Sequence, residues 1–266
     1  MVMYRGARVV TKSLSTIGRS VLLTRDVIVA IVTGVVRRDL ALGEVVTQAV
    51  TLLRVTSLPA FLVAIPFGAV VSVQVGALVD QVGANSLVGA ASGMGIIRQG
   101  APLATGVLIG GVCASAIAAD LGARSIREEL DAMRVMGVDP VARLIAPRLL
   151  ALILIAPMLL IAIVAVSMLI ALAVALAKFG ISAGGFWSSF GAFSNAADLV
   201  FAVLKAECGA VVVGLVAGLR GIEARGGPRG VADAVNSSVV LSIMLIFLST
   251  LALTQVETMF FPSAVA

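Results

Sequence analysis

Two long stretches without any charged residue constrain the fold more than any other feature of this chain. Residues 99–119 and residues 149–177 contain no Asp, Glu, Lys or Arg. A helix of about 20 predominantly apolar residues is long enough to cross roughly 30 Å of hydrocarbon. Charged residues make up 12% of the chain, whereas a soluble domain normally carries roughly 25%. The sequence therefore predicts an all-α integral membrane protein.

Five transmembrane helices are expected, preceded by an N-terminal interfacial helix. From Leu42 to Leu53, apolar side chains recur at helical spacing with polar ones opposite, which is typical of a helix lying in the membrane interface. We expect residues 1–54 to form a cytoplasmic or interfacial region and residues 55–266 the transmembrane domain. The Gly- and Ser-rich residues 80–98 are predicted to lie at the outer face. The expected spans are residues 58–79, 101–119, 149–177, 199–219 and 234–256.

The basic residues form three patches separated by apolar runs. Lys and Arg accumulate on the cytoplasmic side of membrane proteins, so all three patches are expected to face the cytoplasm, with the N-terminus inside and the C-terminus outside. The net charge of +5 then reports topology and not nucleic-acid binding. An aromatic cluster around Trp187 suits a short helix at the outer interface. The patches are Arg5, Arg8, Lys12, Arg19, Arg25, Arg37 and Arg38; Arg124, Arg127, Arg134, Arg143 and Arg148; and Arg220, Arg225 and Arg229.

Several kinds of chemistry are excluded or disfavoured by residues that the chain lacks. There is no histidine, which rules out His-containing zinc sites and Ser-His-Asp catalysis. Cys113 and Cys208 lie in apolar segments, where packing is the expected role. The chain has no G-x-x-x-x-G-K-[ST] sequence, so it has no P-loop of its own for ATP. We expect no catalytic residue, no metal and no bound cofactor in this chain.

One polar segment interrupts the apolar runs, with the sequence REELDAMRVMGVDP after Ser125 and Ile126. The spacing of Ser125 and Glu128 predicts a capping box that starts a helix at Ser125. Asp131 is expected to pair with Arg127 and with Arg134, and Gly137 to end the helix. These features alone fit either a solvated loop helix or a docking element for a cytoplasmic partner.

A resemblance decides between these alternatives. The run DLGARSIREELDAMRVMGVDPVARLIAPR, residues 120–148, resembles the signature of the MlaE/YrbE family, the permease subunits of ABC transporters that move lipids with Mce-domain proteins. The segments DLVF with Lys205, and GGPRGV at residues 226–231, resemble a second block of that family. Within the family the chain looks most like the actinobacterial YrbE proteins.

The resemblance implies a partner and a site at the polar segment. Residues 126–137 would form a coupling helix that binds a cytoplasmic ABC ATPase, on which ATP and Mg²⁺ would be held. A second YrbE-type permease, identical or different, and Mce-domain proteins would complete the transporter in a bacterial inner membrane. The lipid would be of the fatty acid, sterol or phospholipid class. The implied contacts of the coupling helix are Arg127, Glu128, Glu129, Asp131, Arg134 and Gly137.

A lipid cavity is implied at the outer ends of the first, second and fifth spans. Apolar walls with a few polar groups suit a lipid, and Gln74 is the single polar group of its stripe, although it could equally bond across a helix interface. Gln99 stands where the family usually has Glu, which suggests a different lipid head group. The cavity residues expected are Val71, Gln74, Val75, Leu78, Arg98 and Gln99.

Two further charges lie at membrane depth in the fourth span, Lys205 and Glu207. Two positions apart on a helix, they point in nearly opposite directions and each needs another partner. Lys205 and Glu207 are expected either to pair with another span or to act in gating or lipid contact. An ion-coupled secondary transporter that uses these charges is one alternative function. A non-transporting scaffold, suggested by the close spacing of Gly106 and Gly110, is another.

Overall fold

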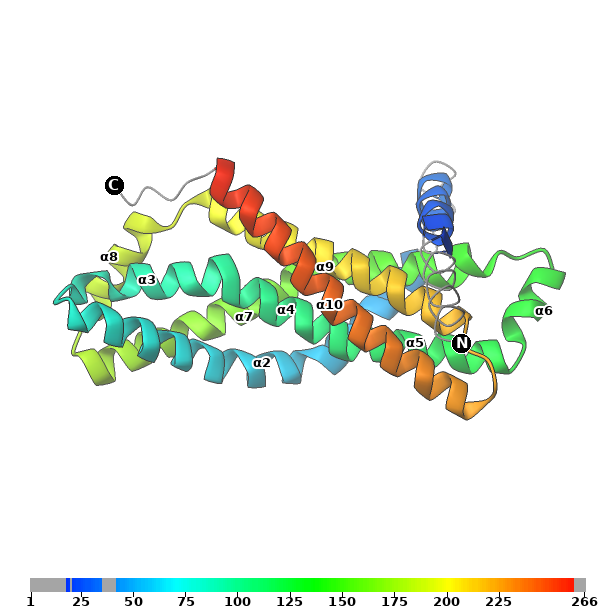
Figure 1. Cartoon of the computed structure of the whole chain (residues 1–266), viewed down its shortest axis with the longest axis horizontal. Helices are drawn as coiled ribbons and strands as arrows, with labels where there is room; N and C mark the ends of the chain where they lie inside the picture. The colour runs from blue at the N-terminus through cyan, green and yellow to red at the C-terminus, as the bar shows by residue number, and fades with distance from the viewer. Residues whose placement is uncertain (1–17, 20, 35–41, 261–266) are drawn as a thin grey trace, which may run out of the picture.

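The protein is a bundle of long helices that run along one axis (Figure 1), described in a computed structural model for residues 18–19, 21–34 and 42–260. All regular secondary structure in these residues is helical. Five helical segments are long and apolar enough to cross a membrane, which confirms the predicted all-α membrane fold. They are Leu42–Gln81, Asn85–Ile126, Val141–Phe179, Ala196–Ile222 and Pro228–Phe260.

The second and third segments are composite, because short turns of 3₁₀- or π-helix (η) interrupt them. A short helix, α6, projects beyond one end of the bundle and another, α8, lies at the opposite end (Figure 1); we call these the α6 end and the α8 end. The elements are α2 (Leu42–Gln81), η1 (Asn85–Leu87), α3 (Val88–Met94), η2 (Gly95–Gly100), α4 (Ala101–Leu108), η3 (Ile109–Cys113), α5 (Ala114–Ile126), α6 (Glu129–Val135), η4 (Val141–Ile145), α7 (Ala146–Phe179), α8 (Ala183–Phe193), α9 (Ala196–Ile222) and α10 (Pro228–Phe260).

Helices α2 and α7 pack against each other through small residues. A Cβ atom added to Gly68 would lie 2.3 Å from the backbone oxygen of Ser167, so the two backbones are too close for a side chain there. The hydroxyl of Ser167 donates to the carbonyl of Ala64 (3.0 Å), and that of Ser72 donates to the carbonyl of Ala171 (3.0 Å). Small residues and interhelical hydrogen bonds are the usual basis of helix association in lipid, where apolar burial gives little advantage.

Helix α9 occupies the middle of the bundle and contacts α4, α5, α7 and α10. Its Gly214 and Gly218 face Leu149 and Ile145, which leave no room for a larger side chain. Gly106 and Gly110 both face Ile246 of α10. Their close spacing therefore serves packing within the chain.

The expected separate interfacial helix from Leu42 to Leu53 is wrong. These residues are the first three turns of α2, which continues through the expected boundary between residues 54 and 55 to Gln81. The reason is that the same face stays buried on both sides of that boundary. The buried positions recur every three or four residues: Val45, Ala49, Leu52, Thr56, Ala60, Ala64, Gly68, Ser72 and Gly76.

A helix oriented as expected for the membrane interface, across the bundle axis, does occur, but earlier in the chain than predicted. Residues 21–34 are helical and run across the long axis, the dark blue helix of Figure 1. Val27 is fully buried against the core, whereas several apolar residues around it are exposed. An apolar face exposed on a helix in this orientation is what a helix in the membrane interface requires. The exposed residues are Val21, Leu22, Ile28, Val29 and Val32.

Residues 80–98 are more helical than their composition indicated, because helix resumes at Asn85 and continues into the second span, while their location at the outer face stays a prediction. The glycines there pack against α8. Cβ atoms added to Gly89 and Gly93 would lie 2.2 Å from the backbone oxygen of Phe186 and 2.3 Å from the ring of Phe190. Small residues that looked like interruptions in the sequence are thus contact positions between helices. The predicted short helix around Trp187 is confirmed as α8.

We predict that Gly68→Ala destabilises the protein. The added methyl group would force α2 and α7 apart and strain the Ser167–Ala64 hydrogen bond, at a cost of about 1–3 kcal/mol. Thermal unfolding of the purified protein in detergent measures the effect. Gly111→Ala is the matched control, because nothing lies within 4 Å of a Cβ at that position. Equal unfolding temperatures for the two variants would contradict the close approach of α2 and α7.

Candidate functional site

The polar segment forms a turn and a short helix, and the capping box predicted at Ser125 is wrong. Ser125 lies in the last turn of α5, and α6 begins only at Glu129. Between them Glu128 adopts the left-handed conformation, with φ of 60°. This conformation is uncommon for a residue with a Cβ atom, and here it changes the direction of the chain. The expected helix over residues 126–137 is therefore limited to Glu129–Val135.

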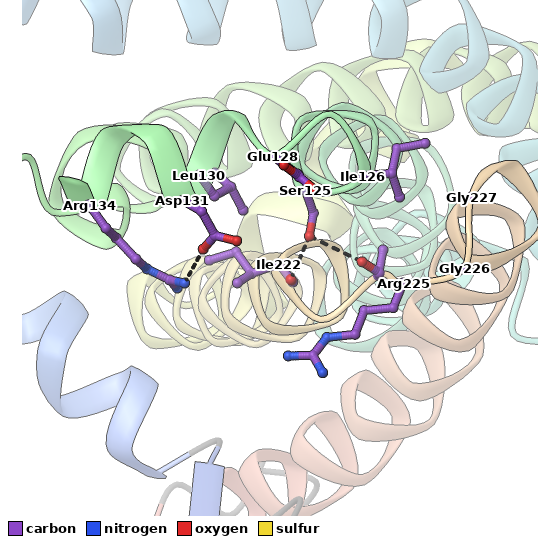
Figure 2. A pocket seen from close by; sticks show the side chains of 11 residues that line it. Ser125, Ile126, Glu128, Leu130, Asp131, Arg134, Ile222, Arg225, Gly226 and Gly227 are labelled. Carbon is purple, nitrogen blue, oxygen red and sulfur yellow. Dashed lines mark hydrogen bonds and ion pairs between the residues drawn. The ribbon is translucent and has the colours of Figure 1, made fainter. Parts of the chain in front are cut away.

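Ser125 has partners that sequence spacing could not reveal. Its hydroxyl lies 3.0 Å from the carbonyl oxygen of Ile222 and 3.1 Å from that of Ala224. Figure 2 shows this hydroxyl between the end of α5 and the turn that follows α9. The carbonyls at the end of a helix have no partner within the helix, so Ser125 serves as a cap for α9 and joins two loops that lie about 100 positions apart in the sequence.

The C-terminal end of α6 matches the prediction that Gly137 ends the helix. Gly137 has φ of 78°, and its amide donates to the carbonyl of Arg134 (3.0 Å). The amide of Val138 donates to the carbonyl of Met133 (2.9 Å). This pair of hydrogen bonds is a Schellman motif, in which a residue with positive φ, most often Gly, ends the helix.

The charged side chains of the segment pair mainly among themselves. The predicted Asp131–Arg134 pair is present, with N and O 2.8 Å apart. Arg127 does not reach Asp131, because the turn at Glu128 separates them, and it pairs with Glu129 (3.0 Å). All of these side chains are at least two-fifths exposed. Surface pairs of this kind add little stability, so they do not explain why the segment is so polar.

The tip of α6 is exposed, whereas its inner side is anchored. Leu130 is 3% exposed, while Val135 and Met136 are 89% and 71% exposed. A groove of about 380 Å³ separates α6 from the turn between α9 and α10 (Figure 2). That turn contains Gly226 and Gly227, both with positive φ, which makes it a tight turn. The α6 end thus presents a projecting helix with apolar residues at its tip and a polar groove beside it.

A second constellation lies inside the bundle, and we call Arg98, Asp198, Lys205 and Glu257 the buried ion cluster. Lys205 is 2% exposed, and its Nζ lies 2.5 Å from Glu257 of α10. The same Nζ donates to the backbone oxygen of Arg98 (2.8 Å). The Arg98 guanidinium in turn pairs with Asp198 (2.9 Å). The cluster therefore connects the second, fourth and fifth spans.

Pairing of Lys205 with another span is confirmed, but its partner was missed. Glu257 stands one residue beyond the uncharged stretch that predicted the fifth span, and α10 runs on to Phe260. Asp198, in the first turn of α9, pairs with Arg98 and completes a capping box with Asn195. Glu257 could have been found by extending the predicted fifth span by one helical turn, to include the first charged residue after the uncharged stretch.

Glu207 is not part of the cluster. It is half-buried on another side of α9, and no ion pair to it occurs within residues 42–260. Of the four side chains expected from α2 for the lipid cavity, Val71 and Val75 are partly buried, whereas Gln74 and Leu78 are exposed. Arg98 points toward α9 through its ion pair, while Gln99 accepts a hydrogen bond from Thr254 (3.4 Å). The assignment of Val71, Gln74, Val75, Leu78, Arg98 and Gln99 to a lipid cavity stays a prediction.

Within the described residues, no group of three or more His, Cys, Asp or Glu side chains could hold a metal ion. Cys113 is buried and Cys208 half-buried, and both are free thiols. The two sites that stand out are therefore a projecting helix outside the spans and an ion cluster between them. Neither has the nucleophile, base and donor arrangement of an enzyme. The fold defines a multi-pass, all-α membrane protein.

Comparisons with known proteins name the family. The chain matches the family Permease MlaE over residues 45–256 and belongs to that family. Probable ABC transporter permease proteins are among its relatives. One from Synechocystis is 28% identical over 187 residues, or 70% of this chain and 71% of the relative. One from Rickettsia felis is 24% identical over 227 residues, or 85% of this chain and 87% of the relative.

A plant protein is also similar. Protein TRIGALACTOSYLDIACYLGLYCEROL 1, chloroplastic, from Arabidopsis thaliana is 27% identical over 175 residues. The match covers 66% of this chain and spans half the length of the Arabidopsis protein. The matched part of this chain therefore corresponds to half the length of the Arabidopsis protein. It corresponds to most of the length of the Synechocystis and Rickettsia felis proteins.

We predict that Glu257→Gln strongly destabilises the protein. The change leaves the Lys205 ammonium buried without a counter-charge, which costs about 3–5 kcal/mol when one partner of a buried pair is removed. Replacing both residues, with Lys205→Met and Glu257→Met, removes both charges and is expected to be better tolerated. Thermal unfolding in detergent compares the variants.

Glu207→Gln is the control, because that carboxyl has no ion pair within the described residues. Its unfolding temperature is expected to match that of the unmodified protein. A Glu257→Gln variant as stable as this control would show that the buried pair is not needed for folding.

Proposed function

We propose that this chain is the permease subunit of an ATP-driven lipid transporter, with ATP hydrolysed on a separate ABC ATPase subunit. Membership of the MlaE permease family and the ABC permease relatives support this function. The chain has no P-loop sequence, so ATP and Mg²⁺ are proposed to bind to the partner. We propose no making or breaking of a lipid bond by this chain, since the residues that the structure describes bring together no nucleophile, base and donor.

One observation carries the proposal, namely the geometry of α6. A short helix ended by a Schellman motif stands outside the spans, between the second and third of them, and Leu130 holds its inner side (Figure 1). Val135 and Met136 are exposed at its tip next to charged side chains. Exposed apolar residues within a charged rim are typical of a protein interface. The occupant proposed is the ATPase.

The sidedness of the membrane follows from charge. The α6 end carries the arginines of α5, α6 and the turn after α9, whereas the last turn of α7 at the α8 end carries Lys178. Positive charge accumulates on the cytoplasmic side, so the α6 end is assigned to the cytoplasm. Residues 21–34 would then lie in the inner leaflet of a bacterial plasma membrane, with the N-terminus inside.

The cargo and the outer partners rest on the family resemblance. A second permease of the YrbE type and Mce-domain proteins are proposed as partners, and an actinobacterial type of system as the setting. The name of the Arabidopsis relative contains that of a galactolipid, which supports a lipid cargo. Fatty acids, sterols and phospholipids are the classes proposed here. The exposed Gln74 and Leu78 would meet such a lipid where two permeases adjoin.

We predict that reversing two charges at α6, with Glu128→Lys and Asp131→Lys, prevents recovery of the ATPase. Like charges placed across an interface cost several kcal/mol, so recovery is expected to fall by at least about tenfold. The assay is affinity purification of the permease from its native cells, with quantitative mass spectrometry of the subunits and lipids that accompany it. The thermal unfolding temperature of the permease alone is expected to stay the same.

The matched control reverses Asp80 and Asp233, which changes the net charge equally at exposed positions outside α6. Its ATPase recovery is expected to equal that of the unmodified chain. Normal recovery in the α6 variant would defeat the docking assignment. Failure of the unmodified chain to recover any ATPase would favour a scaffold, and transport driven by a proton gradient without ATPase would favour a secondary transporter.

A further inference from the structure

Three side chains near the end of α5 bind three different parts of the molecule, and together with Arg148 we call them the α5 junction: Asp120, Arg124, Ser125 and Arg148. The Asp120 carboxylate pairs with Arg148 of α7. Both of its oxygens also lie 3.3 Å from Nε of Arg124. Since Asp120 and Arg148 stand on the two spans that flank α6, their pair closes the base of the loop that carries this helix.

The Asp120–Arg148 pair is partly buried, so it differs from the exposed pairs of α6. The Arg148 side chain is 5% exposed, although that of Asp120 is 43% exposed. A second nitrogen of Arg148 donates to the carbonyl of Leu144 within its own segment (3.3 Å). A buried guanidinium without a counter-charge is costly, and α5 and α7 are therefore held together at this point.

The junction also reaches α6 and α9. Arg124 lies 3.9 Å from Glu129, the first residue of α6. Ser125 donates to the carbonyls of Ile222 and Ala224 at the end of α9. Within α6 itself Leu130 is the buried residue. Besides the direct chain connection from α6 to η4 and α7 through residues 136–140, a force applied to α6 therefore reaches the spans through α5, by contacts that lead to α7 on one side and to α9 on the other.

The junction has no comparable bond to α2. A space of about 260 Å³ lies beside it, and α2 contributes Gln48, Thr51 and Leu52 to the wall. Gln48 and Thr51 bond within α2, to Glu44 and to the carbonyl of Thr47. Within the described residues no hydrogen bond joins the junction to this part of α2, where the attraction between Arg148 and Glu44 is the electrostatic contact. The hydrogen bonds of α7 to α2, made by Ser72 and Ser167, lie farther along the two helices.

We propose that the α5 junction transmits movement of α6 to α7 and α9, with Asp120 and Ser125 as positioning residues that couple the ATPase to the spans. This inference rests on the proposed function, because it needs an ATPase bound at α6. It goes further in stating which contacts carry the movement and which do not. Substitutions at the junction test this coupling directly.

The test uses the complete complex with its ATPase. Spin labels on cysteines introduced at the exposed Val82 and Met259 report the distance between the ends of α2 and α10 at the α8 end, after Cys113 and Cys208 have been replaced by Ala. ATP hydrolysis and ATPase content are measured on the same samples. The complex without junction changes is expected to show a distance shift upon addition of ATP and Mg²⁺.

Asp120→Asn and Ser125→Ala are each expected to keep the ATPase bound and hydrolysing ATP, while the ATP-dependent distance shift is lost. Asp120→Glu, which keeps the carboxylate, is expected to restore the shift. The matched controls are Asp233→Asn, an exposed acid of α10, and Ser237→Ala, whose hydroxyl donates to the carbonyl of Ala234 in its own helix. Both controls are expected to keep the shift.

An unchanged shift in Asp120→Asn or in Ser125→Ala would overturn the inference, as would the absence of any shift in the complex without junction changes. Should Asp120→Asn fail to fold, Ser125→Ala decides alone, because it removes a hydroxyl without leaving a buried charge. These outcomes differ from failure of the proposed function, in which the unmodified permease recovers no ATPase at all.

Discussion

Close contact between helices at small residues is the constraint on which the rest of the structure depends. In lipid, moving an apolar side chain from the lipid tails to the protein interior gains little free energy. Helices therefore associate through close packing and hydrogen bonds. The contact of Gly68 with Ser167, and the hydroxyl bonds of Ser72 and Ser167 to the opposite helix, join α2 to α7 in this way. Glycines of α9 do the same at the centre of the bundle.

This close packing brings charged groups on different spans within reach of one another. Because α9 lies between its neighbours without bulky side chains, Lys205 can reach Glu257 and the backbone of Arg98 across three spans. At the α6 end, the close approach of α5 to α9 brings Ser125 to the end of α9, and the Asp120–Arg148 pair joins α5 to α7. Buried pairs are expensive to leave incomplete, so both sets specify how the spans are arranged.

Sequence reasoning succeeded where a pattern is local and failed where a partner is distant. The positions of the spans, the Schellman end of α6 at Gly137 and the Asp131–Arg134 pair all follow from residues a few positions apart. The capping box at Ser125 was wrong because a competing partner, the end of α9, lies 97 residues away. Likewise the stripe from Leu42 to Leu53 looked like an interfacial helix, since the sequence does not reveal that α2 continues the same buried face.

The sequence by itself determined that this chain crosses a membrane as helices, because long uncharged runs leave their backbone polar groups no other way to be satisfied in lipid. It also determined the family, through the motif around α6. Only the tertiary structure decided which charges meet, since Lys205 and Glu257 lie 52 residues apart, and Asp120 and Arg148 lie 28 apart. Such pairs depend on how helices cross, and crossing is set by the summed packing of many small residues.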